Sequence, residues 1–512
     1  MSMVVQHNMQ AANANRMLGI TSGAQAKSTE KLSSGYKINR AADDAAGLTI
    51  SEKMRKQIRG LDKASSNAQD GVSSVQTAEG ALTEVHSMLQ RMNELAVQAA
   101  NGTNSKDTDR KAIQDEIDQL NTEIDRVAET TKFNEIYLLK GDDGEKTVNM
   151  KAHDAGLKGT LTDNGDGTAT FTMAALNDGD TVSIGGKNYT IGSLKADADK
   201  LVAAPGTGTK KLTIGDKTFV LKAGDTKVYD ETGTNQVFVK TADGTTAATG
   251  ATAFSTGAEL TTTSKYKDDT NTDKDNTAVT IANLKDYIKG GVKVSDGTTT
   301  LTVLNDAKDA TGAVGNDGVD DNDNSLITKK KAYELAAKEL LAANQIGDTE
   351  GSAKVGVGDV GTAVNLTNGT GTFQIQTGSA KVANTLSFSL HVGADADMTN
   401  KITVDIDTMN SANLGIKGLN VTDKNGSAAT YAIDAISDAI SKVSSQRSAL
   451  GAVQNRLEHT IDNLDNISEN TSSAESRIRD TDMAKEMVNY SKNNILAQAG
   501  QSMLAQANQS NQ

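Results

Sequence analysis

The chain has 512 residues and no cysteine. That absence excludes disulfides, thiolate metal sites and cysteine nucleophiles. Tryptophan is also absent and Pro205 is the single proline, so long uninterrupted helices are possible. Aromatic residues make up only 3% and hydrophobic residues only 36% of the chain, which is little for one compact core of this size. We therefore expect an elongated molecule with thin cores.

Charge and hydropathy exclude two classes of partner. The formal net charge is −14, which argues against nucleic acid, because phosphate backbones are bound by basic surfaces. No apolar run approaches the roughly 20 residues of a membrane-spanning helix, so we expect no membrane insertion. The first residues, MSMVVQHNMQAANANRML, contain no basic segment followed by an apolar one. No cleavable signal peptide is predicted.

Motifs for catalysis, metals or cofactors are missing. The five histidines are dispersed, and the sequence contains no H-E-x-x-H, phosphate-binding loop or dinucleotide-binding glycine pattern. The acidic run Asp317, Asp320, Asp321 and Asp323 is the stronger of two candidates for calcium, because the segment DNGDG at 163–167 fails the spacing of a calcium loop. Asn322 stands where a calcium loop needs glycine, and no glutamate closes the loop, so we interpret the run as a solvated loop. We predict no enzyme activity, no cofactor and no metal.

Composition divides the chain into three parts. Of the 46 glycines, 35 lie within 141–424, and all 11 arginines lie outside that range. The ends carry a helical pattern, in which small or apolar residues recur every three or four positions over 54–99, 113–127 and 433–464. These stripes predict helices from about 44 to 100, from about 107, and across 433–464. None could bury its stripe alone, so we expect a bundle built from both termini.

The outermost segments, 1–34 and 480–512, carry softer stripes. The large apolar residues of these stripes are Met17, Leu18, Leu32, Met483, Met487, Val488, Ile495, Leu496, Met503 and Leu504. Helices of this kind are marginal alone in water and need a partner surface. The three strong stripes favour an intramolecular core, whereas packing between molecules is at least as good an explanation for the outermost ones.

The centre has the pattern of β-rich modules. Residues alternate in polarity over 182–191, 212–221 and 292–303 around central turn residues, which predicts three hairpins. Short helices are expected at about 193–203, 280–290 and 327–344. The fold class is therefore mainly α at the two ends, with a β-rich α+β centre in an elongated, multi-domain molecule.

Blocks at both ends resemble bacterial flagellin. At the N-terminal end these are LSSGYKINRAADDAAGL at 32–48 and QRMNELAVQ at 90–98, and at the C-terminal end LGAVQNRLE at 450–458, ESRIRD at 475–480 and ILAQA at 495–499. The resemblance covers about 1–140 and 425–512. The centre resembles nothing that we can name, which is typical of the family's variable outer domains.

The resemblance implies a division into five parts. Residues 1–44 would form a coiled-coil helix and a spoke, 45–175 and 411–479 the two halves of a rod domain, 176–410 the exposed outer domains, and 480–512 the second coiled-coil helix. The terminal helices would pair and line a central channel of a filament. A hairpin at about 136–175 and a strand near 411–424 would complete the rod.

The resemblance also implies function and partners. The chain would be an extracellular structural subunit that polymerises with itself into the flagellar filament for motility. It would leave the cell through the flagellar type III system, with an export chaperone, and would meet the filament cap and hook-associated proteins. Toll-like receptor 5 would recognise the monomer through Arg91, Leu95 and Glu116. Because Arg91 and Leu95 are four apart and one step off the stripe, we expect both to be at least partly exposed.

Two further expectations concern assembly and identity. Six arginines could fix lateral register between subunits by pairing with carboxylates: Arg55, Arg59, Arg126, Arg456, Arg477 and Arg479. Ordinary solvation of a helix face is an equally good explanation for any one of them. The alternatives to a flagellin are a hook–filament junction protein and a flagellin that carries an accessory binding or enzymatic insert.

Overall fold

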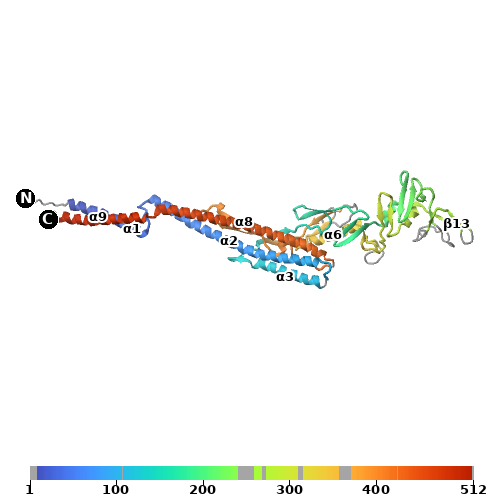
Figure 1. The fold of residues 1–512 in the computed structure, drawn as a ribbon, viewed down its shortest axis with the longest axis horizontal. Coiled ribbons are helices and arrows are strands. Elements are labelled where there is room, and N and C mark those ends of the chain that lie inside the picture. Colours follow the sequence, from blue (N-terminus) through green and yellow to red (C-terminus); the bar gives the residue numbers. More distant parts are fainter. Residues whose placement is uncertain are drawn as a thin grey trace, which may run out of the picture.

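The protein is a long, narrow molecule in which the two chain ends lie together (Figure 1). The computed structural model describes residues 9–105, 108–239, 259–267, 272–308, 315–356, 371–423 and 425–509. Paired helices occupy the end that holds both termini, and the β-rich centre of the sequence occupies the opposite end (Figure 1). The elongated shape and the helical ends predicted from composition are confirmed.

The terminal helices α1 (Met9–Ser34) and α9 (Met483–Gln509) pack against each other. Two short connectors, residues 35–44 and 480–482, join these helices to α2 and α8. Tyr36 forms an antiparallel bridge with Asp480, and the Lys37 N–H donates to the Arg479 carbonyl over 2.6 Å. The terminal stripes thus partner one another, as the resemblance implied.

Three helices form the rod: α2 (Ala45–Ala100), α3 (Asp109–Thr130) and α8 (Ser427–Arg479). Helix α2 begins where the Asp44 carboxylate accepts from the Gly47 N–H over 2.8 Å, a side-chain N-cap. The predicted stripe is confirmed, because Val75, Leu82 and Leu89 are fully buried against α8 and α3. The start predicted near residue 107 lies outside the described residues, and the described helix begins at Asp109.

Short strands complete the rod. They are β1 (Lys132–Phe133), β2 (Ile136–Tyr137), β3 (Asp142–Asn149), β21 (Ser379–Asn384), β22 (Leu386–His391) and β23 (Lys401–Ile406), with the 3-10 helix η3 (Met398–Asn400) between the last two. β22 and β23 form an antiparallel hairpin that packs on α2 and α8. β3 pairs with β21, more than 200 residues away, and not with a neighbouring strand. The hairpin predicted over 136–175 is therefore wrong in its first half.

The strand expected near 411–424 is also wrong. That segment begins with the short helix α7 (Ser411–Leu414), and 415–423 contains no strand. Asn410 caps the helix, and the Asp125 carboxylate of α3 accepts from both the Ser411 N–H and its hydroxyl. Gly415 closes the helix in the left-handed conformation, at φ 75°. Bonds from α3 therefore favour a helical turn over an extended chain.

The proximal outer module lies next to the rod. Its strands form two sheets: β19 (Lys354–Gly356), β20 (Thr372–Gln376), β5 (Thr168–Met173) and β4 (Gly159–Asp163), then β18 (Leu326–Thr328), β7 (Lys187–Gly192) and β6 (Thr181–Ile184). Helix α6 (Lys329–Asn344) covers them and contributes Tyr333 to a core with Phe171 and Phe373. The predicted 182–191 hairpin and the helix near 327–344 are confirmed.

The distal outer module is inserted into the proximal one after residue 192. It contains α4 (Lys195–Leu201), β8 (Thr209–Ile214), β9 (Lys217–Lys222), β10 (Val228–Tyr229), β11 (Phe238–Val239), β12 (Leu260–Thr261), β13 (Lys265–Lys267), β14 (Asp273–Asp275), β15 (Thr277–Ala278), α5 (Ile281–Leu284), the 3-10 helix η2 (Lys285–Tyr287), β16 (Lys293–Ser295) and β17 (Thr300–Thr302). β8–β9 and β16–β17 are the other two predicted hairpins, and both join one five-stranded sheet.

The rod and the proximal module are joined through α8. Tyr431, in the second turn of α8, is buried in the core of the proximal module. Its hydroxyl donates to the Glu339 carboxylate of α6 over 2.5 Å, and burial, followed by this bond, raises the pKa of Tyr431 above its ordinary value. One helix therefore spans from the outer core to the spoke, which fixes the two parts to each other.

Candidate functional site

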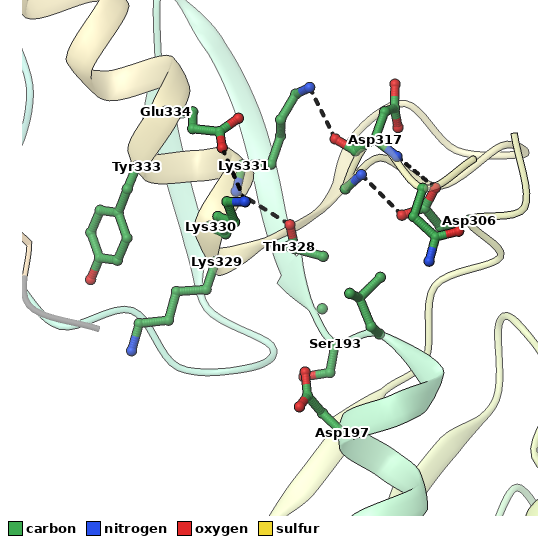
Figure 2. A pocket seen from close by; sticks show the side chains of 14 residues that line it. Ser193, Asp197, Asp306, Asp317, Thr328, Lys329, Lys330, Lys331, Tyr333 and Glu334 are labelled. Atoms are coloured by element: carbon green, nitrogen blue, oxygen red, sulfur yellow. Dashed lines mark hydrogen bonds and ion pairs between the residues drawn. The ribbon is translucent and has the colours of Figure 1, made fainter. Parts of the chain in front are cut away.

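The outer modules contain a polar cavity. A cavity of about 720 Å³ lies beside the start of α6 (Figure 2). Most of its charged side chains already have structural partners. The Lys331 ammonium donates to the Asp317 carbonyl over 3.0 Å, and Lys330 lies 3.8 Å from Glu334. The hydroxyl of Ser193, which lines the cavity, donates to one carboxylate oxygen of Asp178 over 2.8 Å, and the other oxygen accepts from the Thr302 N–H. Both oxygens of Asp178 are thus bound within the fold, and we interpret the pair as structural.

The acidic run that the sequence offered for calcium caps its own loops. Asp320 is buried and accepts from the Asn305, Asn322 and Asp323 N–H groups. Asp317 and Asp323 accept from backbone N–H groups two residues ahead of them, and Asp321 accepts from Ala307. Within the described ranges, no three acidic or histidine side chains converge to hold a metal ion.

The terminal helices expose most of their apolar residues. The exposed ones among those predicted for assembly are Met17, Met483, Met487, Val488, Ile495, Leu496 and Met503, whereas Leu18, Leu32 and Leu504 are half-buried between the two helices or at the spoke. Ile20 is exposed as well. We call this set of exposed residues the terminal apolar surface. On α9, Met487, Val488 and Ile495 line an open apolar groove. So much exposed apolar area on one element is typical of an interaction site.

The three residues expected to bind a receptor lie together on the rod. The Arg91 guanidinium of α2 pairs with Glu116 of α3 at 2.8 Å and with Glu94 at 3.2 Å. Hydrogen bonds to Glu116, and then to Glu94, raise the pKa of Arg91 above its ordinary value. Arg91 and Glu116 remain about half-exposed, at 50% and 44% of their side chains. The pair therefore presents a fixed, ordered charge group to solvent.

Leu95 does not share that exposure. Its exposed fraction is 2%, so the expectation that it is at least partly exposed is wrong. It belongs to the rod core, together with Met92 and Ala96 of α2 and Ile117 of α3. The reason is that α2 contacts two helices, α8 and α3, and therefore buries a wider stripe than the narrow seam that its spacing indicated.

Half of the six arginines considered for lateral contacts pair within the chain. Arg55 pairs with Glu52 at 3.4 Å and Arg126 with Glu123 at 2.5 Å, both three residues apart on one helix. Arg479 pairs with Glu52 at 2.8 Å. Arg59, Arg456 and Arg477 are exposed, and none forms an ion pair with another described residue. The second group is the one that remains open to a neighbouring molecule.

Arg110 is a structural site that sequence reasoning missed. It is 1% exposed, and its guanidinium donates to the carbonyls of Ala99 at 2.8 Å, Asn101 at 3.2 Å and Asp423 at 2.8 Å. The first two carbonyls belong to the end of α2, where a positive charge is favourable for the helix dipole. The third belongs to the loop before α8. Arg110 thus joins all three rod helices at their outer end.

At the inner end of the rod, an open cluster fastens the spoke. Arg479 lies 4.6 Å from the centre of the Tyr36 ring and pairs with Glu52 of α2. The Ser51 hydroxyl donates to Glu475 over 2.8 Å, which ties α2 to α8 at the same level. The hydrogen bond from Arg479 is the main cause that lowers the pKa of Glu52 below its ordinary value. This cluster sets the direction in which the terminal pair leaves the rod.

Comparison with known proteins adds to this geometry. The profile of the bacterial flagellin N-terminal helical region matches residues 5–143, and that of the C-terminal helical region matches 433–512. The chain is 36% identical over 513 residues to a flagellin of Clostridium tyrobutyricum, with all of both chains aligned. It is 33% identical to polar flagellin A of Vibrio parahaemolyticus, covering all of this chain and 98% of the relative. Among the described helices, none has the length and apolar character needed to cross a membrane.

Proposed function

Because the chain belongs to the bacterial flagellin family, we propose that α1 and α9 drive its assembly through the terminal apolar surface. The protein is a structural, non-enzymatic subunit of the extracellular flagellar filament. The observation that carries the proposal is the contrast in burial. Ser28 and Ala497 are the only described buried residues of α1 and α9, whereas α2 buries a continuous stripe.

Burial in a polymer is the physical reason for this role. Each large apolar side chain that leaves water contributes roughly 1.5 to 3 kcal/mol, so several per subunit give a strong drive to assemble. Within the filament the terminal pairs line the central channel, the rod forms the wall and the outer modules project from the surface. The predicted division at residues 1–44, 45–175, 176–410, 411–479 and 480–512 needs two changes for this arrangement. The strands β4 and β5 (159–173) pack in the core of the proximal outer module, and β22 and β23 (386–406) pack in the rod core.

Truncation tests the role of the terminal helices. Removing 1–30 or 490–512 should abolish polymerisation and leave the rod and outer modules folded, because the rod core includes no residue of either segment. Filaments are counted by negative-stain electron microscopy after addition of a kosmotropic salt, and folding is followed by circular dichroism. Filaments formed by either truncated chain would refute the proposal.

We also propose that Toll-like receptor 5 binds the monomer at the half-exposed pair of Arg91 and Glu116. Charged, ordered side chains that are already held in position lose little entropy on binding. Leu95 would act from beneath, by holding α2 against α3, and would not touch the receptor. Assembly and receptor binding can use the same side of the rod, because the receptor meets the free monomer, in which this side is not yet covered by a neighbouring subunit.

Receptor activation by purified monomers tests this second proposal. Arg91→Ala and Glu116→Ala should each raise the concentration for half-maximal activation by about tenfold or more, the effect of a central interface residue. The matched control is Arg126→Ala, which removes an exposed ion pair within α3, spaced three residues apart like the pair of Arg91 with Glu94. Leu95→Ala should act only in proportion to the loss of monomer stability. Equal responses of Arg91→Ala and the control would contradict the assignment.

The same family membership supports the remaining partners. The exposed apolar residues of α1 and α9 need shielding before assembly, which is a task for an export chaperone. We propose that the subunit travels unfolded through the type III apparatus, adds beneath the filament cap, and meets hook-associated proteins at the base of the filament.

A further inference from the structure

Two oppositely charged helix faces of the rod have no partner among the residues that the structure describes. On α2, the segment 53–63 holds five basic residues and one acidic residue. On α3, 109–130 holds seven acidic and three basic residues, and one of the basic three, Arg110, is buried. Such separation of charge within one rod points to a contact between copies of the chain, where opposite faces meet.

The basic side chains of α2 form one stripe. Lys56, Arg59 and Lys63 are three and four residues apart, which places them on a single face of the helix. All three are exposed, and none forms a hydrogen bond or an ion pair with the residues that the structure describes. The stripe lies on the inner half of α2, where α8 and the β22–β23 hairpin pack on other faces through Leu61, Gly60 and Gly71.

The acidic side chains of α3 form a matching face. Asp115, Asp118 and Glu129 are exposed and point away from Ile113, Ile117 and Ile124, which pack in the rod core. Neither the Asp115 nor the Glu129 carboxylate forms a hydrogen bond or ion pair within the described ranges, and the Asp118 carboxylate accepts only from Gln114 there, at 2.9 Å. The ion pairs of α3 use other acidic residues. Glu116 pairs with Arg91 of α2, and Glu123 pairs with Arg126 of α3 itself.

Each face is unfavourable in the isolated subunit. Like charges three or four residues apart on a helix repel each other and destabilise it. Lys56, Arg59 and Lys63 have that spacing, and so do Asp115 and Asp118. Because one helical turn separates Lys56 from Arg59 and Asp115 from Asp118, the two pairs come into register when the helices lie side by side.

We propose that the basic stripe of α2 (Lys56, Arg59 and Lys63) binds the acidic face of α3 (Asp115, Asp118 and Glu129) of a second copy in the filament. The inference rests on polymerisation of this chain, and it adds a rod contact to the role of the terminal helices. A single exposed ion pair contributes little to stability. A set repeated at every subunit removes the repulsion within both faces and sets the register of neighbouring rods.

Charge reversal and its compensation test the contact. Lys56→Glu with Arg59→Glu reverses the stripe, and Asp115→Lys with Asp118→Lys reverses the acidic face. Each double variant should raise the critical concentration for seeded polymerisation by about tenfold or more, because like charges then meet across the contact. The quadruple variant, with both faces reversed, should return to within about twofold of the natural chain, since the contact is restored with opposite sign.

Controls separate this contact from folding and from total charge. Lys211→Glu with Lys217→Glu, at exposed positions on β8 and β9, makes the same change in net charge as the stripe reversal and should leave polymerisation unchanged. Unfolding of each monomer is followed by circular dichroism. If the stripe reversal destabilises the monomer, Lys56→Gln with Arg59→Gln replaces it and should still raise the critical concentration.

The outcomes against the proposal are distinct. Double variants that polymerise like the natural chain, or a quadruple variant no better than the doubles, would overturn it. A reversed α3 face that alters receptor activation alone would assign that face to the receptor and also overturn it. A natural chain that forms no filaments would instead contradict the filament function itself.

Discussion

The terminal pair and the rod pair show how the same architecture serves two purposes. In both, a helix from the N-terminal part of the chain packs on one from the C-terminal part: α1 on α9, and α2 on α8. The rod pair buries a continuous stripe from Leu61 to Ala99 on α2, and α3 and the β22–β23 hairpin widen its core. Among the described elements, no third one packs closely on the terminal pair, and Val488 and Ile495 stay exposed.

The difference shows where stability and where assembly are encoded. A helix pair that buries its apolar stripe inside the molecule is stable as a monomer and has little left to offer a neighbour. A pair that leaves its large side chains in water is marginal alone, and it gains most of its packing when another copy covers it. The chain thus keeps a folded rod in the monomer and reserves the terminal helices for the polymer.

Matched truncations in the two pairs give the largest contrast. Leu89→Ala empties a fully buried position of the rod and should lower the free energy of unfolding by roughly 3 to 5 kcal/mol. Val488→Ala removes an exposed side chain of α9 and should change monomer stability by less than about 0.5 kcal/mol, yet weaken polymerisation. Denaturant unfolding followed at a helical circular dichroism signal measures the first effect, and filament sedimentation measures the second.

The contrast would be broken by either of two results. A stable Leu89→Ala monomer would show that the rod does not depend on its stripe. A Val488→Ala monomer that unfolds as easily as Leu89→Ala would show that the terminal pair is already packed before assembly.

The two ends of the rod sharpen the comparison. Arg110 closes the outer end in full burial, and its removal leaves the carbonyls of Ala99, Asn101 and Asp423 without this donor. Arg110→Ala should lower the free energy of unfolding by roughly 1.5 to 3 kcal/mol, the range for a hydrogen bond that involves a charged group. Arg110→Lys keeps the charge but not the three-way geometry, and should recover only part of the loss. An unchanged melting transition for Arg110→Ala would remove this residue from the account of rod stability.

Much of the rod could be predicted, because its signal is local and repeated. The spacing of three and four residues persists from Met54 to Ala99, and one helix of that length follows directly from it. Hairpins with a turn at their centre, such as 182–191, are equally local. The exposed residues of α1 and α9 were also found from their soft stripes, since small polar neighbours distinguish them from core helices.

The misses all depend on contacts between distant segments. Leu95 is buried because α3 returns along α2, and nothing in the spacing of α2 shows that third helix. The pairing of β3 with β21 and the turn of helix at 411–414 depend on strands or carboxylates far along the chain. Arg110 looks like a surface arginine in sequence, and only the meeting of three helix ends explains its burial.

The smallest expected effect concerns the spoke, where the contribution of Glu52 to stability depends on pH. The hydrogen bond from Arg479 lowers the pKa of Glu52, so the native state holds this carboxylate ionised at lower pH than the unfolded chain does. Glu52 therefore stabilises the fold at pH values above its unfolded pKa, about 4.3, and this contribution disappears as the pH falls through the lower, native value. Glu52→Gln should melt slightly earlier than the natural chain at pH 7 and coincide with it near pH 2. Both melting curves are measured by circular dichroism, with Glu94→Gln as a control on the same helix.

Because Glu52 is exposed, the difference at pH 7 between the melting temperatures of the two chains should be small and should shrink in high salt. A difference that persists in acid would show that Glu52 acts through packing and not through its charge.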